Sequence, residues 1–120
     1  MDIALWIVSG VLAAAYVLAG TMKTFRPQEK LADLPWTQHY SAGTVKFIGI
    51  AELLGGIGLI LPWLTGIAPV LTPLAASGLA LVQALAIIHH LRHGERKPLP
   101  MNAGLLLAAL FVAVFRFASL

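Results

Sequence analysis

Four long runs of apolar residues alternate with short polar connections along this chain. The runs cover approximately residues 3–22, 43–63, 69–91 and 101–117. Each approaches the roughly 20 residues that an α-helix needs to cross the hydrocarbon core of a bilayer. Prolines and polar residues separate the runs, so each run predicts a helix of its own. The pattern predicts an all-α fold, a four-transmembrane-helix bundle that forms a single membrane domain over residues 1–120.

The first apolar run could instead be the core of a cleaved signal peptide. It begins with Asp2 rather than a basic residue, and it is longer than a typical signal core. We therefore expect an uncleaved first helix, which ends at Lys23.

Basic residues are concentrated in the first and third connections, whereas the second connection, residues 65–72, has none. Those that flank or occupy the two basic connections are Lys23, Arg26, Lys30, Lys46, Arg92, Arg96 and Lys97. By the positive-inside rule, basic connections face the cytoplasm. We therefore expect a multi-pass protein of the bacterial inner membrane with both termini outside. Trp6 and Trp63 then fall at the outer interface, and Arg116 is expected to extend toward the lipid headgroups there.

The first connection is long enough to hold a structural element of its own. Within residues 26–34, a proline stands where a first helical turn would accept it, and Leu31 and Leu34 form an apolar pair. We expect a short interfacial helix between the first and second spans. An irregular loop is the alternative.

Composition supports a membrane class and excludes several others. The chain is 59% hydrophobic and 11% charged, whereas soluble domains carry about 25% charged residues. It has no cysteine, which excludes disulfides, thiolate metal sites and thiol redox chemistry within the chain. The net charge of +3 is spread between the apolar runs rather than along one helix, so no nucleic acid partner is expected.

Glu52 is a lone carboxylate inside the second apolar run. An ionised group at the centre of a transmembrane helix costs roughly 2.5 kcal/mol or more, so it indicates a partner, a cavity or a function. A rise of about 1.5 Å per residue places polar residues of the other helices at a similar depth or nearer the cytoplasmic side. These residues are Tyr16, Lys23, Gln83, His90 and Asn102. We expect the four helices to share one buried polar pocket around Glu52.

Each of these residues also has a purely structural interpretation. Glu52 is either an acceptor for Lys23, Lys46 or Tyr16, a carboxyl that stays protonated, or a contact for a ligand or a proton. Lys46 lies six residues from Glu52 on a different helix face, so Lys23 is the preferred partner. Tyr16 and Gln83 are expected to bond helix to helix rather than to contact a substrate.

The histidines at the end of the third run suggest metal binding only weakly. His89 and His90 are adjacent and point about 100° apart on a helix. His89 and His93 are four residues apart and could share an ion. That helix has no nearby carboxylate, so no metal site is expected.

Three segments carry a resemblance that covers nearly the whole chain. The first run closes with Ala19-Gly20-x-x-Lys23, and the third ends in His90-x-Arg92-x-Gly94-Glu95. The second contains the most specific pattern, Lys46-x-x-Gly49-x-x-Glu52-Leu53-Leu54-Gly55-Gly56-x-Gly58-Leu59-x-Leu61-Pro62. Together they resemble the DoxX-like family of small four-helix bacterial membrane proteins. The resemblance implies a bundle with the glutamate buried. It also implies a link to respiratory redox chemistry, because the family name comes from subunits associated with thiosulfate:quinone oxidoreductase.

Two classes of function remain open. The first is an accessory or quinone- or lipid-binding protein, linked to respiration or oxidative stress, with its pocket around Glu52. The second is a membrane assembly or scaffold protein in which Glu52 and Lys23 form a structural pair and no ligand binds. A transporter is disfavoured because inverted repeats are not evident.

An enzyme is also disfavoured, because we see no nucleophile with its base, no phosphate loop and no metal constellation. The expected partners are the lipid bilayer and either a larger membrane complex or further copies of the chain. No intrinsic cofactor is expected, and a quinone or a lipid is the candidate ligand.

Overall fold

Four α-helices make up most of the computed structural model, which describes residues 2–25 and 40–120. They are α1 (Asp2–Phe25), α2 (Ala42–Thr65), α3 (Leu71–Arg92) and α4 (Leu99–Ala118), and the described residues include no strand. All four are long and apolar enough to cross a membrane. The predicted all-α fold with four membrane-spanning helices is thus confirmed. The short interfacial helix expected over residues 26–34 lies outside the described residues.

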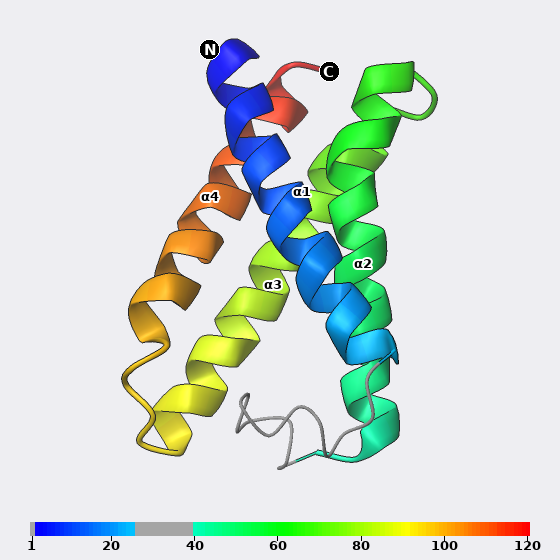
Figure 1. The fold of residues 1–120 in the computed structure, drawn as a ribbon. Helices are drawn as coiled ribbons and strands as arrows, with labels where there is room; N and C mark the ends of the chain where they lie inside the picture. The colour runs from blue at the N-terminus through cyan, green and yellow to red at the C-terminus, as the bar shows by residue number, and fades with distance from the viewer. Residues whose placement is uncertain (1, 26–39) are drawn as a thin grey trace.

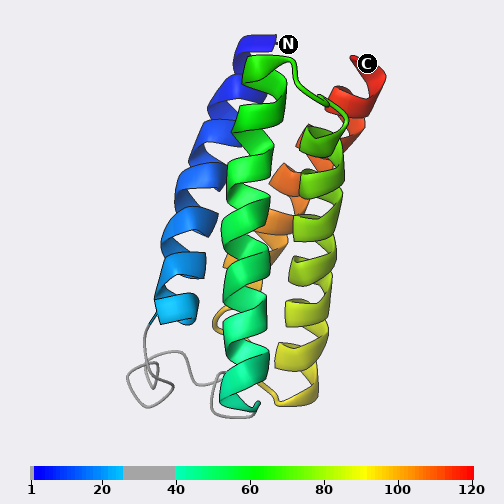
Figure 2. The same ribbon diagram turned by 90° about the vertical axis from the view of Figure 1, so that its right-hand side faces the viewer.

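The helices run side by side, with both termini and the α2–α3 turn at one end (Figure 1). We call this the terminal end. α1 packs mainly against α2, and α3 mainly against α4. Figure 2 shows α2 between α1 and α3, with α4 behind them. The opposite end, which we call the basic end, carries Lys23, Lys46, Arg92, Arg96 and Lys97.

Local capping determines where α2 begins and ends. The Ser41 hydroxyl accepts a hydrogen bond from the Thr44 backbone N–H at 3.1 Å, which satisfies one orphan donor of the first turn. At the other end, Gly66 has φ 73°, and its N–H donates to the Pro62 carbonyl. Glycine adopts this left-handed conformation without a steric penalty, so the helix ends there and turns into α3.

The outer surface of the bundle is apolar. Large hydrophobic side chains remain exposed on every helix, among them Leu18, Phe47, Leu81 and Leu107. The interior is built from smaller and medium side chains of all four helices. A surface of this kind suits lipid rather than water, and with the four apolar helices it describes a small multi-pass membrane protein.

Glycines let the backbones of α1 and α2 approach closely near the basic end. A Cβ atom on Gly20 would lie 2.5 Å from the Leu53 backbone nitrogen and 2.6 Å from the Gly49 carbonyl oxygen. A Cβ atom on Gly49 would lie 2.7 Å from the Lys23 Cβ atom. Real side chains do not fit at these distances, so the α1–α2 crossing requires glycine on both helices. Small residues have this role where lipid provides no hydrophobic drive between helices.

We expect Gly20→Ala to lower the stability of the bundle, because backbone atoms of α2 block the added methyl group. Overpacking of this kind costs about 1–3 kcal/mol. Gly10→Ala in the same helix is the matched control, since nothing lies within 4 Å of a Cβ atom there. Unfolding by SDS in mixed micelles should separate the two variants. Equal stability would contradict the close approach.

Candidate functional site

Lys23 and Glu52 form an ion pair between α1 and α2. The Lys23 Nζ donates to the Glu52 Oε1 at 2.6 Å, and the side chains are only 10% and 4% exposed. Lys23 lies in the last turn of α1, one turn beyond Gly20, and Glu52 lies one turn beyond Gly49 in α2. The close approach of the two glycines therefore brings the charged side chains together.

Tyr16 and Gln83 join α1 to α3 through a second buried contact. The Gln83 Nε2 donates to the Tyr16 Oη at 2.7 Å, and both side chains are buried. Tyr16 lies seven residues, or about two helical turns, before Lys23 in α1. Gln83 Oε1 is buried and has no hydrogen-bond partner among the described residues. One interior region thus combines an ion pair with an amide oxygen that still has bonding capacity.

His90 and Asn102 are buried as well but lie nearer the basic end. His90 Nδ1 lies 3.2 Å from Glu95 Oε1, so this histidine points toward the α3–α4 connection. Asn102 is buried in the first turn of α4, and its Nδ2 has no hydrogen-bond partner within residues 2–25 and 40–120. The six predicted site residues therefore separate into the Lys23–Glu52 pair, the Tyr16–Gln83 pair, and these two residues.

Arg116 corrects an expectation from the sequence. Its side chain does not extend to the headgroups: it is 1% exposed, and its Cζ lies 5.0 Å from the Trp6 ring centroid and 4.4 Å from that of Trp63. Its Nη1 donates to Asp2 Oδ1 at 3.3 Å. The expectation was wrong because two indole rings and a carboxylate offer a guanidinium better partners than headgroups do.

The sequence contained a signal for this cluster. Asp2, Trp6, Trp63 and Arg116 all lie at the same predicted membrane side, and Asp2 and Arg116 have opposite charges. Depth and opposite charge could have indicated this contact, which was not among the predictions from the sequence. Which of them meet depends on how α1, α2 and α4 are rotated about their axes.

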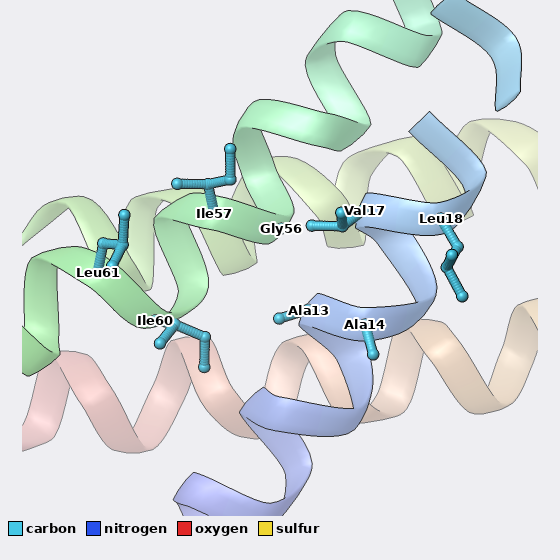
Figure 3. Close-up of a pocket in the computed structure, with 8 residues that line it drawn as sticks. All are labelled: Ala13, Ala14, Val17, Leu18, Gly56, Ile57, Ile60 and Leu61. Carbon is cyan, nitrogen blue, oxygen red and sulfur yellow. The ribbon is translucent and has the colours of Figure 1, made fainter. Parts of the chain in front are cut away.

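An apolar groove of about 500 Å³ follows the seam between α1 and α2 on the terminal side of the ion pair. Figure 3 shows side chains of both helices around it. The lining residues are Ala13, Ala14, Val17, Leu18, Gly56, Ile57, Ile60 and Leu61. Gly56 lies one helical turn beyond Glu52, so the groove begins close to the polar interior. Its lining is entirely apolar.

Comparison with known protein families matches residues 7–113 to the model of the DoxX-like family. The chain belongs to the DoxX-like family. The matched segment contains both buried pairs of this DoxX-like protein, Lys23–Glu52 and Tyr16–Gln83, whereas Asp2, Trp6 and Arg116 lie outside it. No curated protein and no solved structure matches the chain.

The buried groups of this DoxX-like protein include both hydrogen-bond donors and acceptors. Lys23 Nζ and the Tyr16 hydroxyl are donors, whereas Glu52 and Gln83 Oε1 are acceptors. Hydrogen bonds to these groups are electrostatically stronger than in water, because the dielectric constant inside the bundle is low. The interior thus presents groups of both hydrogen-bonding kinds within one region of the bundle.

We expect Lys23→Met to destabilise the DoxX-like bundle by about 3–5 kcal/mol, because it leaves the Glu52 carboxylate buried without its cation. The double variant Lys23→Met/Glu52→Leu should recover most of this loss, since it removes both charges. SDS unfolding in mixed micelles measures the free energy of unfolding of the wild type and of each variant.

Lys46→Met is the control, because Lys46 is an exposed lysine near the same end of the bundle. We expect it to change the free energy of unfolding by no more than about 0.5 kcal/mol. A single variant at Lys23 as mild as this control would show that the pair does not stabilise the bundle.

Proposed function

We propose that this DoxX-like protein is a non-enzymatic accessory protein that binds the head group of a quinone or another lipid in its interior. The main support is the Gln83 Oε1 atom, a buried acceptor without a hydrogen-bond partner among the described residues. Leaving a buried polar atom unsatisfied costs about 1–3 kcal/mol. A ligand hydroxyl that donates to this atom would remove that cost.

The Tyr16–Gln83 pair suits both redox forms of a quinone. Because Tyr16 Oη accepts from Gln83 Nε2, its own O–H can donate to a quinone carbonyl. Gln83 Oε1 can in turn accept from the hydroxyl of a quinol. Lys23 and Glu52 would add a fixed field beside the head group without entering a reaction.

The lipid tail would follow the apolar groove between α1 and α2. This groove begins one turn from Glu52, and the side chains that line it (Figure 3) include the exposed Leu18, Ile57 and Leu61. Binding of this kind buries the tail against alanine, valine and isoleucine side chains and needs no change of helix packing. The head group would thus lie in the polar interior and the tail in the apolar groove.

The cellular setting belongs to the same proposal. The basic residues gathered at one end of the bundle favour a bacterial inner membrane orientation with both termini outside. A role in respiration or the response to oxidative stress would follow from quinone binding. The partner would then be a quinone-using membrane complex or a second copy of this chain.

A scaffold function is the second candidate, and the Lys23–Glu52 pair favours it. At 2.6 Å the two groups satisfy each other, and they hold α1 against α2 without any ligand. In this case the chain would serve as a rigid four-helix unit that packs against a larger assembly. Glu52→Gln would then lower bundle stability and change no binding.

We expect the wild-type protein to bind a short-chain ubiquinone analogue, and Gln83→Leu to weaken this binding about tenfold, as the loss of one hydrogen bond implies. Isothermal titration in detergent provides the affinities, and native mass spectrometry from lipid nanodiscs shows what co-purifies. Ser77→Ala is the matched control on α3, since its hydroxyl donates only to the Pro73 carbonyl of the same helix.

Two outcomes would count against ligand binding. One is a wild-type protein that binds no analogue and co-purifies with no quinone or lipid. The other is a Gln83→Leu variant that binds as tightly as Ser77→Ala. Either result would favour the scaffold function.

A further inference from the structure

A second group of polar side chains gathers at the basic end, where α3 gives way to the α3–α4 connection. His89 lies in the last turn of α3, His93 caps that helix, and Glu95 follows in the connection. One donor atom from each of the three lies within 4.8 Å of the other two. We propose that His89, His93 and Glu95 bind a divalent transition-metal ion of the Zn²⁺ type.

Helix periodicity and one glycine bring these three residues together. His89 and His93 are four residues apart, and their ring centroids lie 4.2 Å from each other. Gly94 then reverses the chain with φ 68°, and the Glu95 N–H donates to the His90 carbonyl at 2.8 Å. This turn directs the Glu95 carboxylate back to the helix end, where Oε1 lies 3.5 Å from His89 Nε2.

The Glu95 carboxylate is the metal ligand that the helix pattern of α3 did not predict. α3 itself has no acidic residue near His89, and that was the reason to expect no metal here. The structure supplies one from the following turn. Two imidazoles and a carboxylate form a ligand set found in zinc and iron sites, with positions left for water.

Hydrogen bonds already orient both histidines for ligation. His93 Nδ1 lies 2.8 Å from the His89 carbonyl oxygen, which only accepts, so Nδ1 carries the proton and Nε2 keeps its lone pair. His89 Nδ1 lies 2.8 Å from the Tyr40 hydroxyl, which can accept a hydrogen bond from Nδ1–H, the tautomer in which Nε2 carries the lone pair. Metal-binding histidines are typically held through their second nitrogen in this way.

The position of the cluster permits an ion to enter and the ligands to close around it. In a tetrahedral zinc site the donor atoms lie about 3.4 Å apart. The donor atoms here lie within 4.8 Å of one another, so they need to approach by up to about 1.4 Å. His93 is exposed and Glu95 is half-buried, so both can make this shift toward the buried His89. The basic side chains Arg92, Arg96 and Lys97 are exposed, and solvent screens their repulsion of a cation.

The ligand chemistry also selects the ion. Imidazole nitrogens favour Zn²⁺, Co²⁺, Ni²⁺ and Fe²⁺, whereas Mg²⁺ and Ca²⁺ prefer oxygen ligands. We therefore expect Zn²⁺ and Co²⁺ to bind and Mg²⁺ to bind far more weakly. Such an ion would connect α3, the α3–α4 connection and, through Tyr40, the segment before α2.

The test is a competitive titration of Zn²⁺ against a fluorescent chelator, with the full-length untagged protein in detergent. We expect one Zn²⁺ per chain, and His93→Gln and Glu95→Gln should each weaken its affinity by at least about tenfold. Co²⁺ should give visible absorption bands in the wild type that both variants lose. Arg96→Gln is the matched control, since it makes a charge-to-amide change at an exposed residue of the same connection and should leave Zn²⁺ affinity unchanged.

The variants are expected to fold, because His93 is exposed and Glu95 belongs to a connection rather than a helix. Melting curves recorded with a chelator confirm this for each protein. The proposal is overturned if the wild type binds no stoichiometric Zn²⁺, or if either His93→Gln or Glu95→Gln binds Zn²⁺ as tightly as the wild type. It is also overturned if Arg96→Gln weakens binding as much as they do.

Discussion

The contact between the α1 and α2 backbones at Gly20 and Gly49 is the constraint on which the polar interior of this protein depends. Hydrocarbon offers no water to a carboxylate, so Glu52 must find its partner within the bundle. A larger residue at either glycine would hold the helices apart and move Lys23 away from Glu52. The two features therefore support each other, because the glycines bring the charges together and the ion pair then holds the helices in contact.

Polar groups occupy three levels along the bundle, and each level is organised by a different interaction. At the terminal end, the Arg116 guanidinium lies over the rings of Trp6 and Trp63. In the interior, an ion pair and an amide–hydroxyl bond join α1 to α2 and to α3. At the basic end, Glu95 turns back toward the histidines of α3. Of these three levels, the interior one lies one helical turn from the apolar groove, on which the proposed lipid binding depends.

The sequence supported the interior site better than either end. Depth and helix face were enough to relate Tyr16 to Gln83 and Lys23 to Glu52, because all four lie within regular helices whose geometry is known in advance. The same reasoning placed His90 and Asn102 near this group, but His90 faces Glu95, a residue of a connection. It failed for Arg116 because snorkelling assumes a side chain that meets no partner inside the protein. Connections and inter-helix rotations follow no fixed period, so residues that depend on them could not be placed.

By itself, the sequence determined the class of this protein, since four apolar runs of membrane length allow little other than a helical membrane bundle. It also determined that the buried Glu52 carboxylate needs a partner. The free-energy cost of burying a charge arises from its removal from water, whatever the fold. Only the tertiary structure decided which partner it is, how closely α1 and α2 approach, and that Glu95 reaches the histidines. These depend on helix rotation and on a left-handed turn at Gly94, where small changes in backbone angle move a side chain by several ångströms.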